Sequence, residues 1–189
     1  GRPTEIRNLN GYIVEQGRAL GIPTPVNEAL TAMIKTITQK PRAGPGVVAI
    51  DGAVVQPVSL DRAALRQLPA EHQIEEINTR MPSMRGRAVT VRGLLEVPAL
   101  QIDADHVTFH SVDGRYAATL SLAQAKEFGL LVYEVDGEAL PEGKGGPFRL
   151  ITPGLGDLCA NVKAVSRIEV RVGEGRDTRP SERPPSCAS

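Results

Sequence analysis

The sequence predicts an α+β fold with mixed, mostly antiparallel sheets and short helices, preceded by a helical hairpin. Three observations support this prediction. Short apolar runs end at Asp-Gly pairs, which favour tight hairpins because both residues accept a positive φ. Short helical segments stand between these runs, so the strands pair locally rather than in a doubly wound sheet. The first 40 residues instead space their apolar side chains by three and four, as amphipathic helices do.

The N-terminal 40 residues predict two helices, at residues 4–20 and 24–40. Thr24 is a suitable N-cap and Pro25 suits a first helical position, while Lys40-Pro41 ends the second helix. The connection at residues 21–23 is short enough to require a helical hairpin. We therefore predict a hairpin at residues 1–40.

The rest of the chain divides by composition. Residues 41–46 contain two prolines and two glycines and predict a linker, which is followed by a domain at residues 47–172. Apolar residues nearly vanish after Val172, so residues 173–189 are predicted to be a disordered tail.

Within the domain, strands and helices follow from local signals. Strands are expected at residues 47–50, 106–111 and 130–135, before Asp51-Gly52, Asp113-Gly114 and Asp136-Gly137. Helices are expected at residues 62–68, 91–96 and 122–128, the first capped by Asp61 and the last by Ser121.

Charge and cysteine content restrict the function. With 22 basic and 22 acidic side chains, the chain has no net charge to attract nucleic acid or an anionic membrane. No apolar run approaches the roughly 20 residues that span a bilayer. Of the two cysteines, Cys187 lies in a proline-rich tail where nothing would hold it against Cys159. We therefore expect unpaired thiols and a cytoplasmic protein that binds neither nucleic acid nor membrane. The sequence does not indicate an oligomeric state.

The first 40 residues resemble the C-terminal segment of 2-dehydropantoate 2-reductase through Thr4-Glu5-Ile6, Asn10-Gly11 and residues 21–27. The resemblance implies a substrate-site role for Glu5, the one catalytic candidate. However, the chain contains no G-x-G-x-x-G turn to hold a pyrophosphate, and Gly143-Lys144-Gly145-Gly146 is interpreted as a turn. The family's catalytic lysine lies in upstream sequence that this chain does not contain. This chain alone is therefore not expected to bind NADP, and the segment could equally be a hairpin that packs on a neighbour.

Residues 47–170 resemble the molybdopterin-binding domain of sulfite-oxidase-type oxidoreductases. The motifs that carry the resemblance occur in the family's order, at residues 106–114, 120–122, 133–141, 146–150 and 161–170. The resemblance implies a molybdopterin cofactor. Its implied cofactor-binding residues are His110 in the cleft, and Arg149 and Lys163 facing the pterin phosphate. Alternatively, Arg149 and Lys163 are only exposed positions on strands.

The family's metal-ligating cysteine has no counterpart where the resemblance places it, near residues 74–78. A soft thiolate suits molybdenum, and those residues offer none. Cys159 is the candidate replacement ligand, although an unreactive buried cysteine is the ordinary outcome. Ala164 also replaces a tryptophan that would form a cleft wall. His106 and His110 share a strand face with Thr108, but a metal site there lacks a third ligand.

These observations predict an oxidoreductase-like protein with a molybdopterin-type domain that lacks the usual cysteine ligand and has weak catalysis or none. Its ligand is a molybdopterin or another small anion. Two alternatives remain open: a non-catalytic binding or structural module, and a fragment of a 2-dehydropantoate 2-reductase fusion.

Overall fold

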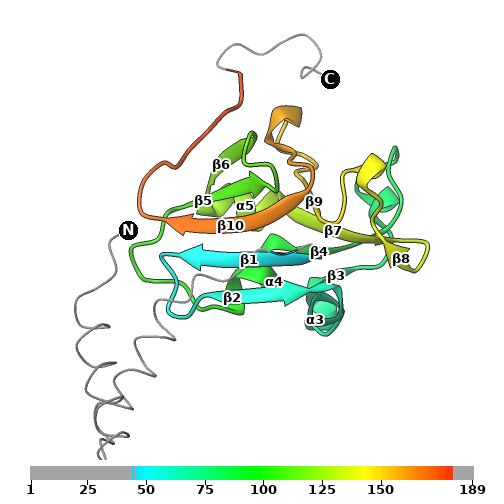
Figure 1. Ribbon diagram of the computed structural model, residues 1–189, viewed down its shortest axis with the longest axis horizontal. Helices are drawn as coiled ribbons and strands as arrows, with labels where there is room; N and C mark the ends of the chain where they lie inside the picture. Colours follow the sequence, from blue (N-terminus) through cyan, green and yellow to red (C-terminus); the bar gives the residue numbers. More distant parts are fainter. Residues whose placement is uncertain (1–43, 45, 181–189) are drawn as a thin grey trace, which may run out of the picture. The chain divides into compact units, whose positions relative to one another are not determined.

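The computed structural model describes residue 44 and residues 46–180 (Figure 1). The chain divides into two compact units at Lys40 and Pro41, and every described residue belongs to the second unit. The predicted helical hairpin, Glu5 and residues 181–189 lie outside the described residues.

The first sheet has five strands in the order β2-β1-β10-β5-β6. β1 runs parallel to β10, and the other neighbours are antiparallel. The strands are β1 (Val47–Gly52), β2 (Val58–Asp61), β5 (His106–Ser111), β6 (Ala117–Ser121) and β10 (Val165–Arg171).

The second sheet is antiparallel throughout, in the order β3-β4-β7-β8, with β9 also paired to β7. Its strands are β3 (Gln73–Ile74), β4 (Arg87–Thr90), β7 (Leu130–Val135), β8 (Glu138–Ala139) and β9 (Arg149–Ile151). The two mostly antiparallel sheets and short helices confirm the predicted α+β class.

Side chains of both sheets share the main hydrophobic core. β7 shows why: Leu131 and Tyr133 enter this core, whereas Leu130 and Val132 enter a smaller cluster around Ile77, because successive side chains of a strand point to opposite faces. The main core includes Val48, Ile50, Phe109 and Ile168 from the first sheet and Val89, Leu131, Tyr133 and Leu150 from the second.

Three short α-helices occur where the sequence predicts them: α3 (Arg62–Arg66), α4 (Val91–Glu96) and α5 (Leu122–Phe128). The Asp61 side chain accepts a hydrogen bond from the Ala64 N–H, and Ser121 forms a reciprocal capping box with Gln124. α3 ends two residues before the predicted Leu68. The described residues also form four 3₁₀ turns, at Ala70–His72, Ile77–Thr79, Glu142–Lys144 and Leu158–Ala160.

Two of the three Asp-Gly pairs form the predicted turns. Asp136 and Gly137 both have positive φ, 52° and 82°, between β7 and β8, and Gly114 has a φ of 66° between β5 and β6. Asp51-Gly52 instead ends β1, so the prediction of a turn there is wrong. A Cβ on Gly52 would lie 2.0 Å from the Val170 carbonyl oxygen, so this glycine serves the close approach of β1 to β10.

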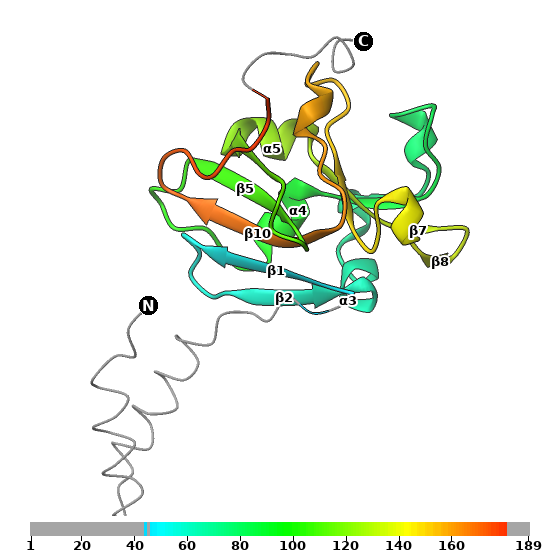
Figure 2. The same cartoon turned by 45° about the horizontal axis from the view of Figure 1, so that its top comes forward.

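The segment after β10 is ordered as far as the structure describes it. Residues 174–180, here called the strap, turn back and lie against β6, the edge strand of the first sheet (Figures 1 and 2, red). The Thr178 N–H donates to the Ala117 carbonyl at 2.9 Å, and the Thr119 N–H donates to Asp177 at 3.2 Å.

The sequence predicts disorder for residues 173–189, whereas residues 177 and 178 form the hydrogen bonds to β6 just described. An edge strand presents unpaired backbone groups, and polar strap residues satisfy them without any apolar periodicity that the sequence could reveal.

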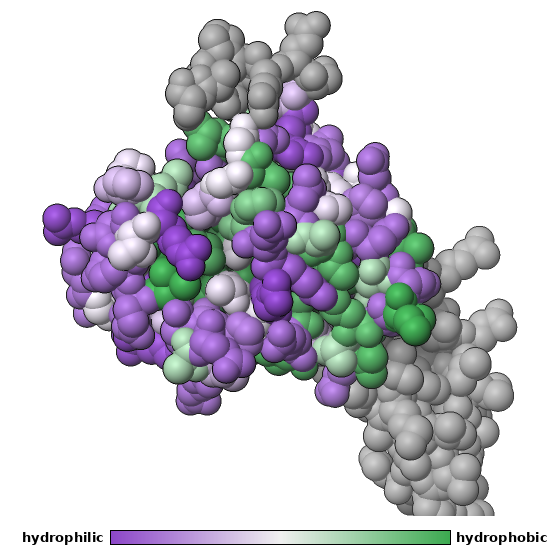
Figure 3. Space-filling model, turned by 180° about the vertical axis from the view of Figure 1, so that it is seen from behind, coloured by the Kyte–Doolittle hydropathy of each residue, from purple (hydrophilic) through white to green (hydrophobic). Residues whose placement is uncertain are grey.

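The surface is mixed in character. Figure 3 shows the face opposite to that of Figure 1, where apolar residues lie among polar ones.

Candidate anion-binding site

Two cationic side chains predicted from the sequence, Arg149 and Lys163, meet at Gly145. A Cβ placed on Gly145 would lie 2.9 Å from the Lys163 Cγ and 3.1 Å from the Arg149 Cδ. Gly145 also has a φ of +90°, which favours glycine. The glycine thus provides both the turn after Glu142–Lys144 and the space that the aliphatic stems of the two side chains occupy.

The elements around Gly145 are tied by backbone hydrogen bonds. Leu150 and Val162 exchange N–H···O bonds of 2.8 and 3.1 Å, which fixes Arg149 and Lys163 on adjoining segments. The Ala164 N–H donates to the Gly145 carbonyl at 2.8 Å. Both cations are therefore placed by rigid backbone on either side of the glycine.

Arg149 is the more constrained of the two. Its Nη1 donates to the Lys144 carbonyl at 3.1 Å, while its buried Nε has no hydrogen-bond partner. Burial lowers the pKa of Arg149 because desolvation disfavours the charged form. Within residues 44 and 46–180, no carboxylate forms an ion pair with Arg149 or Lys163.

A buried polar atom without a partner is costly, and a bound anion would supply the missing acceptor and the opposite charge. Arg149 and Lys163 therefore fit an anionic group such as a phosphate.

His110, the third predicted cofactor residue, lies in a different setting on β5. Its Nε2 is 3.0 Å from a Glu169 oxygen, and Glu169 also pairs with Arg167 and Arg171. Arg167 continues this network to Asp51 on β1 at 2.9 Å. Burial alone would raise the pKa of Glu169, but the Arg167 charge and the His110 hydrogen bond lower it overall. The structure thus places His110 in a charge network that runs across the first sheet.

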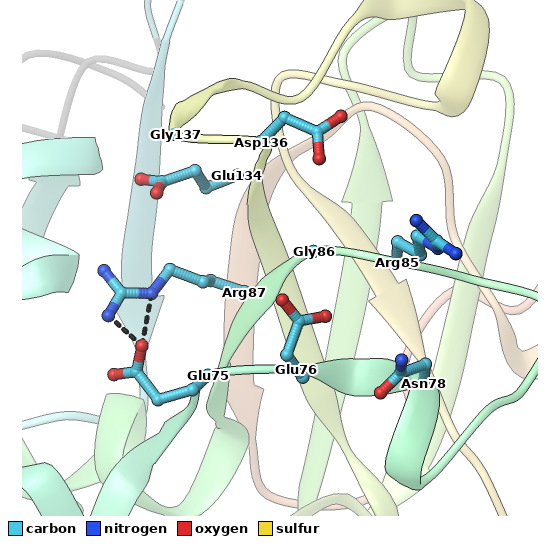
Figure 4. Close-up of a pocket in the computed structure, with 9 residues that line it drawn as sticks. All are labelled: Glu75, Glu76, Asn78, Arg85, Gly86, Arg87, Glu134, Asp136 and Gly137. Atoms are coloured by element: carbon cyan, nitrogen blue, oxygen red, sulfur yellow. Dashed lines mark hydrogen bonds and ion pairs between the residues drawn. The ribbon is translucent and has the colours of Figure 1, made fainter.

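The segment where the resemblance places a metal-ligating cysteine lies beside a polar hollow of about 560 Å³ (Figure 4). Ile77 is fully buried in the smaller core, whereas Glu75, Glu76 and Asn78 line the hollow. The other lining residues include two arginines and two acids, namely Arg85, Arg87, Glu134 and Asp136.

Several charged side chains of the hollow already form ion pairs, and acidic groups outnumber basic ones there. Glu75 pairs with Arg87, and Arg66 binds Glu134 at 2.5 Å. Four carboxylates face two guanidinium groups in the hollow, so it does not suit an anionic oxo-metal group.

Cys159, the candidate replacement ligand, lies in the 3₁₀ turn Leu158–Ala160 and is partly exposed. Its sulfur is disulfide-bonded, so the expectation of an unpaired thiol is wrong. A disulfide sulfur offers no thiolate to a metal. This bond also removes the argument from cysteine use on which the expectation of a reducing compartment rested.

Metal ligation receives no support elsewhere in the part of the chain that the structure describes. No three His, Cys, Asp or Glu side chains there are grouped so that they could hold a metal ion. The described residues therefore fit the phosphate end of a molybdopterin and do not fit the thiolate ligation of its metal.

Gly145 is the site residue that sequence reasoning missed. It stood in the Gly143-Lys144-Gly145-Gly146 segment, which was interpreted only as a turn. That interpretation is correct for the backbone, but a glycine-rich turn that contains a lysine and stands two residues before Arg149 was also a signal of a close approach.

The two mostly antiparallel sheets and the short helices define a class, the molybdopterin-binding fold of oxidoreductases. Residues 79–178, more than half of the chain, match the oxidoreductase molybdopterin binding domain. The chain belongs to this family. A separate match covers residues 1–38, to the C-terminal domain of ketopantoate reductase PanE/ApbA.

Two known proteins illustrate these matches. The crystal structure of the sulfane dehydrogenase SoxCD from Paracoccus pantotrophus superposes with a TM-score of 0.52 at 18% identity, covering 67% of this chain and 38% of that chain. The 2-dehydropantoate 2-reductase of Vibrio cholerae is 55% identical over 38 residues, which are 20% of this chain and 13% of that protein. The first likeness concerns the fold alone, and the chain spans a minor part of both proteins.

No helix among the described residues has both the length and the apolar character needed to cross a lipid bilayer.

Proposed function

We propose that this domain binds a phosphate-bearing ligand of the pterin-cofactor class at Arg149 and Lys163, without a cysteine thiolate to molybdenum. In this proposal, oxo transfer is weak or absent. The observation that carries it is the buried Arg149 Nε, which has no hydrogen-bond partner and whose side-chain stem lies at Gly145 together with that of Lys163.

Two further facts support the proposal. Membership of the molybdopterin-binding family makes a pterin phosphate a plausible partner for the cations. The Arg149 guanidinium can form charge-assisted hydrogen bonds with phosphate oxygens, and Lys163 contributes a mobile point charge. When bound, a molybdopterin would supply the redox chemistry, while Arg149 and Lys163 would hold its phosphate.

The test is cofactor content. The full chain is purified from a host that makes molybdopterin, and pterin and molybdenum are measured per protein. We expect bound pterin in the wild type, less than about one-tenth of it in Arg149→Gln, and molybdenum well below pterin. Arg92→Gln removes an exposed cation on α4 and should retain wild-type pterin.

Equal pterin content in Arg149→Gln and the wild type contradicts the proposal, as does the absence of pterin from both. Absence of pterin from both favours the non-catalytic binding or structural module, whereas equal pterin content would mean that other residues bind the pterin. Molybdenum equal to pterin would contradict the weak metal ligation, because the described residues offer no thiolate for it.

A second candidate function has its own observation, the 55% identity over 38 residues to a 2-dehydropantoate 2-reductase. In this alternative, residues 1–40 are the end of a longer reductase chain, and Glu5 has its substrate-site role. The coding sequence upstream of Gly1 tests it: an in-frame dinucleotide-binding domain supports the fusion, and an unrelated or out-of-frame sequence contradicts it.

A further inference from the structure

Polar contacts hold the strap to two elements, β6 and the 3₁₀ turn Leu158–Ala160. On β6, the Ala117 N–H donates to the Thr178 hydroxyl at 2.8 Å, and the Arg179 guanidinium donates to the Thr119 carbonyl at 2.8 Å. The same guanidinium pairs with Asp157, the N-cap of the turn, at 2.8 Å. The strap therefore ends, at Arg179, in contact with the start of this turn.

The turn that Asp157 begins also contains the disulfide-bonded Cys159. The two oxygens of the Asp157 carboxylate accept from different sides: Oδ1 from the Cys159 N–H at 2.9 Å, and Oδ2 from Arg179. The Tyr116 hydroxyl donates to the Cys159 carbonyl and holds the turn from β6's other flank. One carboxylate thus joins the strap to the residue that carries the disulfide.

The sequence indicates the partner of this disulfide. It contains two cysteines, Cys159 and Cys187, and Cys159 is disulfide-bonded. Cys187 lies outside the described residues, eight positions after Arg179. An extended chain covers roughly 3.3 Å per residue, so eight residues span up to roughly 26 Å and can return to the turn.

The Cys159 side of the bond is open to a reductant. Cys159 is partly exposed, and its neighbour Leu158 is 40% exposed although it is apolar. Thiol–disulfide exchange requires that a thiolate reach one sulfur of the bond, and a partly exposed turn permits this approach.

We propose that Cys159 and Cys187 form a disulfide that fastens the strap over β6, and that a dithiol releases it. The reductant is a small or protein dithiol, which attacks the S–S bond as a thiolate and forms a mixed disulfide. Its second thiol then closes the reductant's own disulfide. Two electrons and two protons pass to the protein, so both cysteines end as thiols.

Release follows from chain entropy. While the bond is intact, a strap that leaves β6 remains part of a closed loop and gains little conformational freedom. Once the bond is reduced, the opened strap is a free chain end, so opening becomes more favourable. The edge of β6 then presents the backbone groups that the strap had covered.

The test uses the full chain, equilibrated with oxidised glutathione and then divided, with one half treated with dithiothreitol. Peptide mapping should find the Cys159 and Cys187 peptides joined before reduction and separate after it. The amides of Ala117 and Thr119, which bond strap residues, should exchange at least about tenfold faster after reduction, while those of β1 should not change.

Two variants complete the test. Cys187→Ser should exchange fast at Ala117 and Thr119 with or without dithiothreitol, whereas Ser186→Ala, its neighbour, should keep the wild-type response. Glutathione adducts, free thiols or a dimer linked through Cys159, in place of the internal cross-link, would overturn the pairing. Equal exchange at Ala117 and Thr119 before and after reduction would overturn the role in holding the strap. Reduction of the wild type keeps the test decisive if Cys187→Ser does not fold.

Discussion

The strap offers a sharp test of the fold, through Gly175→Ala. A Cβ at Gly175 would lie 2.0 Å from the Thr108 Oγ1 and 2.8 Å from the Arg171 Cδ. Thr108 is fully buried and its hydroxyl bonds that of Thr119 at 2.8 Å, so it has little room to yield. The added methyl group should therefore lift the strap from β6.

The cost follows from the contacts that would be lost. Arg179 donates to the Thr119 carbonyl and pairs with Asp157, each at 2.8 Å, and Thr178 pairs with Ala117. Water can replace most of these bonds on an exposed edge, so each contributes only about 0.5–1.5 kcal/mol. With the strain of overpacking added, we expect Gly175→Ala to lower the free energy of unfolding by about 2–3 kcal/mol.

Urea denaturation measures this loss, and hydrogen exchange locates it. The amides of Ala117 and Thr119 should lose protection, while those of β1 should keep theirs. Gly143→Ala is the matched control, because its Cβ would meet nothing within 4 Å and its φ is not positive. Thr108→Ala should restore part of the loss in the double variant. Wild-type stability and exchange in Gly175→Ala would refute the account of the strap.

Three further predictions concern the charge network, a helix cap and the anion site. Burial alone would raise the pKa of Glu169, but Arg167 and other partners lower it below 4.5, so its stabilisation is present above that pH and lost on acidification. Glu169→Gln should lower the free energy of unfolding by about 1–3 kcal/mol at pH 7 and make it less dependent on pH, which urea denaturation at pH values from 3 to 7 would measure. An unchanged pH dependence of the free energy of unfolding contradicts this. Ser121→Ala should lower the free energy of unfolding by about 1 kcal/mol, because α5 loses its N-cap, and urea denaturation measures this change. An unchanged free energy of unfolding would argue against the capping box. Gly145→Ala should lower the free energy of unfolding by about 1–3 kcal/mol and weaken phosphate binding, because the φ of Gly145 is +90° and the Lys163 side chain occupies the space of the added methyl group. Unchanged phosphate binding would show that Gly145 is not part of the site.

Local signals explain what the sequence predicted well. Asp61 and Ser121 cap helices because a short polar side chain can reach an N–H two or three residues ahead. Asp136-Gly137 forms its turn because both residues adopt positive φ.

Non-local pairing explains what the sequence did not reveal. The parallel alignment of β1 with β10 joins residues more than 100 positions apart, and it places Asp51-Gly52 in a strand rather than a turn. The strap docks through polar backbone partners, which leave no hydrophobic period.

The candidate site, too, was predicted in part from the sequence and in part only from the fold. Arg149 and Lys163 were predicted from a family resemblance, but their meeting at Gly145 depends on the pairing of Leu150 with Val162, which only the fold provides. His110 in the cleft stays a prediction from the resemblance, and in the structure its Nε2 lies 3.0 Å from a Glu169 oxygen.

The most direct test of the anion site is the backbone amide of Gly145, followed by NMR while phosphate is added to the full chain. Because Gly145 lies between the two cations, we predict a saturable shift in the wild type and no saturable shift in Arg149→Gln. The same saturable shift in both proteins would contradict an anion site built on Arg149.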